Sequence, residues 1–271
     1  MTQEIRRVVV LLDAAAEADT AIDTAVHLAA QWRVPLHGIF IEDEELIGFA
    51  GLPFARQVTV GAGIEPLTRE QVEEHFRAFA ERAWRELAAA AERHGLKCSF
   101  EIVRGPLAPG ALRGEDDFVV SGSATRPIGD HFRISSRCWS WTAIIVQPFL
   151  LAKRDWETGG SVFTLLRRRG PQSARTIDIA AQIAGFHNGT LTVAGTPDIA
   201  QSDEFAVWVS GLLEGRSLSL RTEPVTAEPA ALRQRIIDLD CRLLILEATE
   251  EDAGDVRDLA ESLACDVLII R

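Results

Sequence analysis

The segment that decides the fold is AIDTAVHLAAQWRVPLHGIFIED, residues 21–43, because its pattern returns as TIDIAAQIAGFHNGTLTVAGTPD in residues 176–198. The two copies align without a gap at a constant offset of 155 residues. In each copy, apolar residues spaced three and four apart predict a helix, and the residues after it predict a strand. The identical positions are Ile22/Ile177, Asp23/Asp178, Ala25/Ala180, Ala29/Ala184, Leu36/Leu191 and Asp43/Asp198. We interpret the repeat as a duplicated domain; the alternative is two unrelated α/β domains of similar pattern.

Short apolar runs alternate with helical patterns along the whole chain. The run VVVLL at residues 8–12 is typical of a parallel strand that is buried on both faces. Further strands are predicted at residues 34–41, 98–103, 118–121, 143–146, 162–166, 190–194, 218–225, 243–246 and 267–270. Helices are predicted at residues 19–32, 68–94, 173–186, 201–213, 229–239 and 251–263. This alternation predicts an α/β fold with a mostly parallel sheet and right-handed crossovers.

The domain organisation follows from the repeat. We predict two tandem domains, residues 1–150 and 151–271, each with a five-stranded, mostly parallel sheet and helices on both faces. A chain of 271 residues is long enough for two cores, since a domain takes ~150 residues. The stretch FLLAKRDWETGG, residues 149–160, is the predicted junction.

Charge and hydropathy limit the partners that the chain can bind. Its 28 basic and 40 acidic residues give a net charge of −12, divided equally between residues 1–150 and 151–271. Such a field opposes nonspecific binding to nucleic acid or to an anionic membrane. The sequence contains no run of ~18 apolar residues, and its first apolar run is too short for a signal peptide. We expect a cytoplasmic protein that binds neither nucleic acid nor membranes.

The sequence lacks the patterns of metal binding and covalent catalysis. Its cysteines form no CxxC pair, and its histidines form no HxH, HExxH or HxxxH pair. It contains no GxSxG elbow and no GxxxxGK[ST] loop. We therefore expect no metal site and no enzyme. The cysteines are Cys98, Cys138, Cys241 and Cys265, and we expect small buried thiols.

Three short segments resemble the universal stress protein family. They are the opening strand that ends in Asp13, the stretch FVVSGS at residues 118–123 and the closing stretch CDVLIIR at residues 265–271. The whole chain resembles a tandem protein of this family, with two copies of its domain. The resemblance implies an adenine-nucleotide alpha-hydrolase-like, Rossmann-like fold. It also implies that closing strands pair edge to edge, in a homodimer or, between residues 143–146 and 267–270, as a pseudo-dimer within one chain.

The resemblance also points to a nucleotide site in the first domain. Nucleotide-binding members carry G-2x-G-9x-G-[S/T] after the fourth strand, where backbone N–H groups bind phosphate. The matching positions are Gly122, Thr125, Ser135 and Ser136, so the spacing is kept but two glycines are replaced. In one interpretation Gly122 and Ser136, with the hydroxyls of Ser123 and Thr125, still bind ATP or AMP. In the other, binding is lost, since a non-glycine residue in a left-handed conformation costs ~1–3 kcal/mol.

Asp13 stands where the family has an acidic residue near the adenine and ribose. An aspartate at a strand end is also a common turn and helix-capping residue, so both roles stay open. In parallel sheets, ligands bind beyond the carboxyl ends of the strands, where the strand order reverses. The candidate cofactor-binding residues are Asp13, Gly122, Ser123, Thr125, Ser135 and Ser136.

The second domain retains no glycine motif. Its fourth predicted strand leads into EATEEDAGD, residues 247–255, and its first leads into Arg167, Arg168 and Arg169. The family's strand order implies that these segments face each other. An ion-pair network, an anion site and a solvated cluster are the three interpretations. We expect ATP or AMP, if either binds, in the first domain only.

An apolar insertion, EELIGFAGLPFARQVTVGAGI at residues 44–64, interrupts the first domain. It packs on its own protein, covers the first-domain pocket, contacts the second domain or binds a partner. We expect a cytoplasmic, non-catalytic stress-response protein that acts through unknown protein partners, with weak or lost nucleotide binding. The alternatives are an ATP- or AMP-binding sensor with its site in the first domain, and a nucleotide hydrolase.

Overall fold

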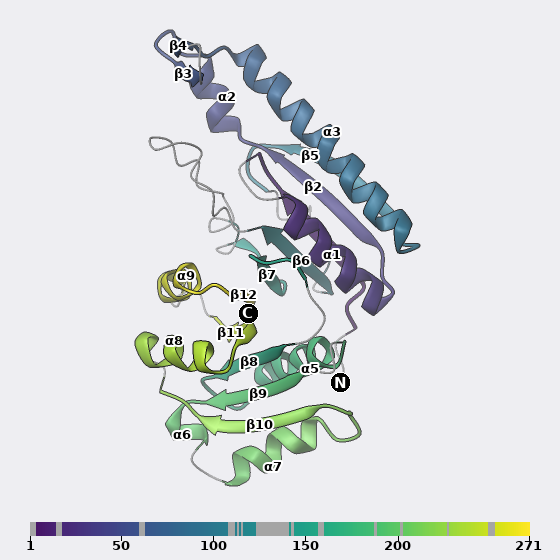
Figure 1. Ribbon diagram of the computed structural model, residues 1–271, viewed down its shortest axis with the longest axis vertical. Helices are drawn as coiled ribbons and strands as arrows, with labels where there is room; N and C mark the ends of the chain where they lie inside the picture. The colour runs from purple at the N-terminus through teal and green to yellow at the C-terminus, as the bar shows by residue number, and fades with distance from the viewer. Residues whose placement is uncertain are drawn as a thin grey trace.

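Ten strands form one continuous sheet in the computed structural model (Figure 1), in the order β10-β9-β8-β11-β12-β7-β6-β1-β2-β5. The structure describes residues 4–14, 18–59, 63–107, 112, 114, 116–122, 141, 144–156, 160–186, 189–200, 203–226, 228–248 and 253–271. The strands of the sheet are β1 (Arg7–Leu12), β2 (Leu36–Glu42), β5 (Cys98–Arg104), β6 (Asp117–Gly122), β7 (Phe149–Ala152), β8 (Ser161–Leu166), β9 (Thr190–Gly195), β10 (Ser219–Pro224), β11 (Cys241–Glu247) and β12 (Asp266–Ile270).

Helices cover both faces of the sheet. One face carries α1 (Ala18–Trp32), α3 (Arg69–Arg93), α5 (Pro171–Phe186) and α7 (Asp203–Leu212). The other carries α8 (Pro229–Asp238) and α9 (Ala253–Ser262). The remaining described elements are α2 (Glu44–Ala50), the hairpin strands β3 (Arg56–Thr59) and β4 (Gly63–Pro66), and α6 (Pro197–Ala200). The predicted α/β class, with its mostly parallel sheet, is confirmed.

The two halves of the sheet have the same topology. In chain order, the strands of each half lie third, second, first, fourth, fifth, and all neighbours within a half are parallel. The strand order therefore reverses between β1 and β6 in the first half, and between β8 and β11 in the second. The β1–α1–β2 unit corresponds to β8–α5–β9, as the repeat of residues 21–43 in 176–198 predicts.

The halves meet where β7 pairs with β12, the one antiparallel pair in the ten-stranded sheet as described. The register joins Leu151 to Val267, Leu150 to Leu268 and Phe149 to Ile269, and all six side chains are buried. The predicted boundary at residue 150 lies within β7, and the division into residues 1–150 and 151–271 stays a prediction.

The predicted strand at residues 143–146 is wrong for residues 144–146, the part of it that the structure describes. Ile145 N–H donates to the carbonyl of Trp141 at 2.9 Å, a helical i to i−4 bond, and Ile144 and Val146 are exposed. The strand is β7, at the start of the stretch predicted as the junction. Pro148 directly precedes β7, and all four β7 residues are buried. A strand between two sheet halves needs burial on both faces, which β7 has and residues 144 and 146 lack.

A tryptophan also connects the two halves across the helix layer. Trp32, at the end of α1, donates its Nε1–H to Gln182 Oε1 of α5 at 2.8 Å. Its ring lies 4.9 Å from that of Phe118 in β6 and 5.6 Å from that of Phe186 in α5. The same side chain thus packs on the first half and hydrogen-bonds to the second.

The insertion at residues 44–64 contains α2 and part of the β3–β4 hairpin. Ile47, Ala50 and Ala55 are buried, and α2 packs against α3. In contrast, Phe54 is 69% exposed and Ile64 is 74% exposed. The insertion therefore packs on its own protein through one side and leaves apolar side chains exposed on the other.

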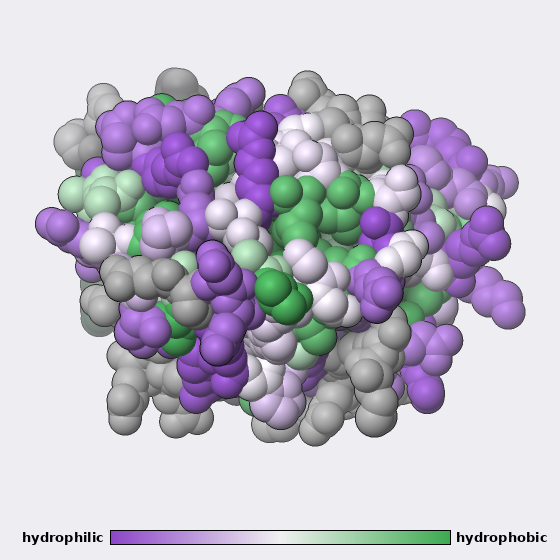
Figure 2. Space-filling view, turned by 90° about the horizontal axis from the view of Figure 1, so that it is seen from below, coloured by the Kyte–Doolittle hydropathy of each residue, from purple (hydrophilic) through white to green (hydrophobic). Residues whose placement is uncertain are grey.

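Exposed apolar side chains also occur at the opposite end of the molecule. Figure 2 views that end from below and shows hydrophobic groups near the middle of the face, between hydrophilic ones. Val207 of α7 is 71% exposed. Helix α7 is much shorter than α3, which takes the equivalent position in the first half, so it covers less of the sheet.

Candidate functional site

The strand order of the first half reverses at β1 and β6, and that of the second half at β8 and β11. We use the name crevice for the carboxyl ends of the two strands at each of these points. The register pairs Leu11 with Ser121, so Asp13 and Gly122 follow within two residues on neighbouring strands. Asp13 is half-buried and Gly122 is buried. The structure therefore brings these two predicted residues to one edge of the sheet. Ser123, Thr125, Ser135 and Ser136 lie outside the described residues.

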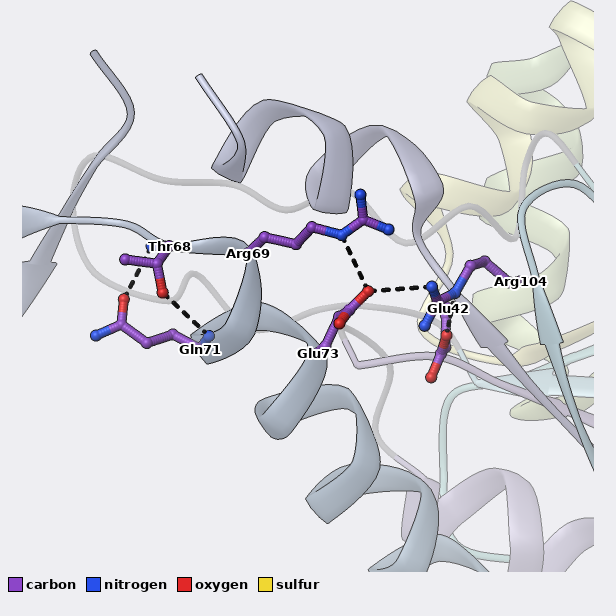
Figure 3. Close-up of polar contacts among 6 residues, drawn as sticks. All are labelled: Glu42, Thr68, Arg69, Gln71, Glu73 and Arg104. Atoms are coloured by element: carbon purple, nitrogen blue, oxygen red, sulfur yellow. Dashed lines mark hydrogen bonds and ion pairs between the residues drawn. The ribbon is translucent and has the colours of Figure 1, made fainter. Parts of the chain in front are cut away.

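A charged network stands at the same edge of the first half (Figure 3). Arg104, the last residue of β5, donates to Glu42 Oε2 at 2.8 Å and to Glu73 Oε1 of α3 at 3.1 Å. Arg69 also donates to Glu73, at 3.1 Å. The hydrogen bond from Arg69 is the main cause that lowers the pKa of Glu73, and the bond to Glu42 is the main cause that raises the pKa of Arg104.

The network ties the start of α3 to the sheet. Thr68 caps the helix: its Oγ1 accepts from Gln71 N–H at 3.3 Å, and Gln71 Oε1 accepts from Thr68 N–H at 2.9 Å (Figure 3). This reciprocal capping box satisfies two backbone donors at the helix N-terminus. Sequence reasoning missed Glu42 and Arg104 as partners. Both are charged residues at the ends of neighbouring strands, and the strand register pairs them directly. This position could have indicated the contact.

The second-half crevice has the same construction with different residues. Leu165 pairs with Leu246, so Arg167 follows β8 as Asp13 follows β1, and Glu247 ends β11 as Gly122 ends β6. An acid and a glycine in the first half thus correspond to a base and an acid in the second. Glycine leaves bare backbone that a phosphate can approach closely, whereas Glu247 adds a side chain there.

Glu247 is a buried carboxyl group without a hydrogen-bond partner among the described residues. Its side chain is on the α5 side of the sheet, it is 8% exposed, and neither carboxylate oxygen is paired. The nearby hydroxyls donate elsewhere: Ser173 to the Arg168 carbonyl at 2.8 Å, and Thr176 to the Gln172 carbonyl at 3.1 Å. Burial raises the pKa of Glu247, and the charge of Arg168 opposes that rise.

The arginines after β8 make separate contacts. Arg168 donates to Gln172 Oε1 at 2.7 Å. Arg169 donates to the Ile199 carbonyl at 2.8 Å and lies 3.7 Å from a carboxylate oxygen of Glu204. Among the described residues, the charge of Arg168 acts on Glu247. Most of the acidic run at residues 247–255 lies outside the described residues. The predicted ion-pair network across this crevice therefore stays a prediction.

A small cavity opens beside this crevice, on the face covered by α8 and α9. Its volume is about 130 Å³. Five aliphatic residues line it, together with Arg167, Pro229 and Glu247; the five are Leu165, Leu232, Leu246, Val256 and Leu259. Sequence reasoning missed this cavity, because it forms only where β8 pairs with the distant β11 and where α8 and α9 pack on these strands.

Other kinds of site find no support in the described residues. They include no group of three or more His, Cys, Asp or Glu side chains arranged to hold a metal ion. Among the described helices, none has both the length and the apolar character needed to cross a membrane. Cys241 and Cys265 are buried free thiols and Cys98 is half-buried, while Cys138 lies outside the described residues.

The fold and its two crevices define an α/β protein built from two doubly wound, five-stranded halves. Two of the solved structures to which the chain is similar are universal stress proteins. One from Pseudomonas aeruginosa, described as putative, is 15% identical, with a TM-score of 0.66 over 99% of this chain and 94% of that one. One from Archaeoglobus fulgidus is 12% identical, with a TM-score of 0.68 over 97% and 96%. A further Pseudomonas aeruginosa protein, of unknown function, is 16% identical, with a TM-score of 0.63 over 99% and 93%.

The chain therefore has the universal stress protein fold over nearly its whole length. No protein-family model matches it, and a search of curated proteins finds no match.

Proposed function

We propose that the chain is a cytoplasmic, non-catalytic protein of the universal stress protein type that takes part in a stress response through protein partners. In this proposal its nucleotide binding is weak or lost. The proposal includes an intrachain pseudo-dimer, and the pairing of the closing strands β7 and β12 supports it. The proposal includes no nucleic-acid or membrane partner, in keeping with the net charge of −12.

The observation that carries the proposal is the difference between the crevices. Both lie at a reversal of strand order, where such folds bind ligands. In the second, Glu247 stands where Gly122 stands in the first, and Arg167 stands where Asp13 does. A buried carboxyl at the end of the fourth strand opposes the close approach of a phosphate group.

A specific observation favours ATP or AMP sensing in the first half as the second candidate function. Gly122 keeps the backbone bare at the end of β6, and Asp13 lies at the same edge. These two residues fit a nucleotide as the resemblance implies: Gly122 would admit a phosphate and Asp13 would accept hydrogen bonds from the sugar. A nucleotide hydrolase has no such support among the described residues.

Calorimetric titration of the nucleotide-stripped protein with ATP, ADP and AMP tests the proposal. We expect no saturable binding below millimolar concentrations and no phosphate release from ATP. The matched variants are Asp13→Ala and Arg167→Ala, which change equivalent positions of the two crevices. Micromolar binding that Asp13→Ala abolishes and Arg167→Ala preserves would establish the sensor instead.

The insertion supplies the surface for partners in this proposal. Phe49 and Phe54 are both exposed, and their ring centroids lie 6.5 Å apart. Ile64, in strand β4 of the hairpin, is exposed as well. Cross-linking in cells, followed by identification of the linked proteins, tests this assignment. The test variant is Phe54→Asp, and the control is Ile144→Asp, which changes an exposed apolar residue outside the insertion. Partners that are lost only with Phe54→Asp support the assignment; identical partner sets for both variants contradict it.

A further inference from the structure

The cavity beside the second-half crevice has the features of a small-molecule site. About 130 Å³ is close to the volume of a dry, apolar cavity of about 150 Å³ that binds benzene in another protein. Its walls are aliphatic side chains from both layers: Leu165 and Leu246 from the sheet, Leu232 from α8, and Val256 and Leu259 from α9. Since a cavity of about 150 Å³ holds benzene, a cavity of about 130 Å³ should hold a hydrocarbon group of about five to seven carbons.

Positive charge is present at the mouth of the cavity. Arg167 belongs to its lining and is exposed, so its guanidinium is at the solvent side of a space whose other charged lining residue is Glu247. A guanidinium has five N–H donors, which allows it to bind a carboxylate through two parallel hydrogen bonds while it keeps another contact.

The N-terminus of α8 adds a second source of positive potential. Pro229 lines the cavity and is the first residue of the helix. The N-cap residue, Glu228, makes no side-chain cap hydrogen bond, as far as the described residues show. Unpaired backbone N–H groups of a first helical turn favour an anion. Two independent elements, a loop arginine and a helix end, thus border the same apolar space.

Glu247 is the acidic residue of the cavity lining, and its side chain belongs to the opposite face of the sheet. Side chains alternate along β11, so Leu244 and Leu246 face α8 and α9, whereas Glu247 shares the opposite face with Leu243 and Ile245. Its carboxyl accordingly lies near Ser173 and Thr176 of α5. Both of its carboxylate oxygens are buried, so they add no exposed negative charge to the cavity.

We propose that this cavity binds a small monocarboxylate with an aromatic or short branched hydrocarbon body. The hydrocarbon fills the aliphatic space, and the carboxylate pairs with Arg167 and faces the start of α8. A phosphate-bearing nucleotide does not fit this description, because the space below the arginine is apolar and holds only about 130 Å³. The inference goes beyond the proposed function and holds whether or not the first half binds ATP or AMP.

Ligand-observed NMR and calorimetry on the full chain test the proposal, with benzoate as the ligand used and benzamide as its neutral isostere. We expect saturable benzoate binding and at least about tenfold weaker binding of benzamide, since a charge-assisted pair is lost. Arg167→Gln should weaken benzoate binding by the same factor. Arg168→Gln is the matched control, because Arg168 hydrogen-bonds to Gln172 of α5 instead, and it should bind benzoate like the parent chain.

A second variant tests the cavity itself. Leu259→Phe fills the space from α9 and should abolish binding of both compounds, with thermal unfolding as the check that the variant is folded. Equal affinities for benzoate and benzamide, equal losses with Arg167→Gln and Arg168→Gln, or no saturable binding at millimolar benzoate would each overturn the proposal. Displacement of benzoate by inorganic phosphate would also overturn it, in favour of a general anion site. Displacement by AMP with Arg167 intact would assign the crevice to nucleotides and overturn both proposals, whereas AMP binding that leaves benzoate bound overturns only the weak-nucleotide proposal.

Discussion

At the first crevice an aspartate follows the first strand and a glycine ends the fourth; at the second, an arginine and a glutamate take these places. The strands around both crevices keep the same order and direction. Their middles are filled by branched and aromatic side chains that are fully buried, such as Val10 and Phe163. The fold therefore depends on the strand interiors, and the residues at the carboxyl ends are free to exchange one chemistry for another.

The largest expected effect on stability comes from placing in the first half the residue found at the equivalent position of the second half. Gly122→Glu introduces a carboxyl at a buried strand end and should lower the free energy of unfolding by more than about 3 kcal/mol. Chemical denaturation measures the loss. Gly48→Glu is the matched control, because Gly48 is exposed in α2 and a Cβ there meets nothing within 4 Å. Equal stabilities of the two variants would mean that the first crevice accepts an acid as readily as the second does.

The second effect concerns the buried acids of the two halves. Asp117 of β6 pairs with Arg7, whose Nε donates to it at 2.9 Å. Asp266 of β12 accepts instead from backbone N–H groups, of Lys153 at 2.7 Å and Arg154 at 3.2 Å, and burial raises its pKa to about 6. An unfolded aspartate has a pKa of about 3.9, so between these values the folded chain holds a proton that the unfolded chain has released. The stability that this proton contributes is full at low pH and falls as the pH rises from about 4 to about 6.

Asp266→Asn removes this titration and keeps the acceptor oxygen. Relative to the parent chain, the variant should gain stability between pH 4 and pH 7, by at most about 3 kcal/mol. Thermal unfolding across that pH range measures the gain. Asp117→Asn is the control with the opposite sign, since it leaves Arg7 without a charged partner at neutral pH. A pH-independent difference between Asp266→Asn and the parent would contradict the assignment.

A smaller gain is expected from Glu247→Gln. The amide removes the charge from a buried group that has no hydrogen-bond partner among the described residues, which should stabilise the chain by about 1 kcal/mol at neutral pH. Because burial raises the pKa of Glu247, the gain should shrink as the pH falls. Denaturant titrations at neutral and acidic pH measure it. A loss of stability at neutral pH would show that the ionised carboxylate is held by a favourable partner.

The smallest effect is expected from the network in Figure 3. Arg104 is about half exposed, so Arg104→Gln should lower the melting temperature only slightly, and high salt should erase the difference. Arg82→Gln breaks one helical pair with Glu86 and serves as the control for a pair within a helix. Thermal unfolding at low salt measures both losses. A larger loss of stability with Arg104→Gln than with Arg82→Gln would show that a network between β2, β5 and α3 stabilises the chain more than one ion pair within a helix.

The sequence was sufficient for the elements with strong local signals. The long helix predicted at residues 68–94 is α3, Arg69–Arg93. Thr68 and Gln71 form a capping box at its start, and this motif is a local sequence signal for a helix N-terminus. The repeat at residues 176–198 correctly matched α5 and β9 to α1 and β2.

Features that depend on distant parts of the chain were not predictable in this way. Residues 143–146 and 149–152 are both short apolar runs, and only the pairing with β12 distinguishes the strand from its neighbour. In the sequence Glu247 is the first residue of the acidic run at residues 247–255, and its burial in strand β11 was not predicted. Asp13 and Gly122 lie at one edge as expected, but that expectation came from the strand order that the family resemblance implies and not from local sequence.

The pairing of β7 with β12 has a consequence for synthesis on the ribosome. The first half has all of its strands once residue 152 has been made, but the edge formed by Phe149, Leu150 and Leu151 has no neighbour until residues 266–270 emerge. At about 5–20 residues per second, that apolar edge waits roughly 5–25 s. During this interval a closing strand from a neighbouring nascent chain competes with the chain's own, so exchange of β12 between copies is the assembly error to which this fold is most exposed.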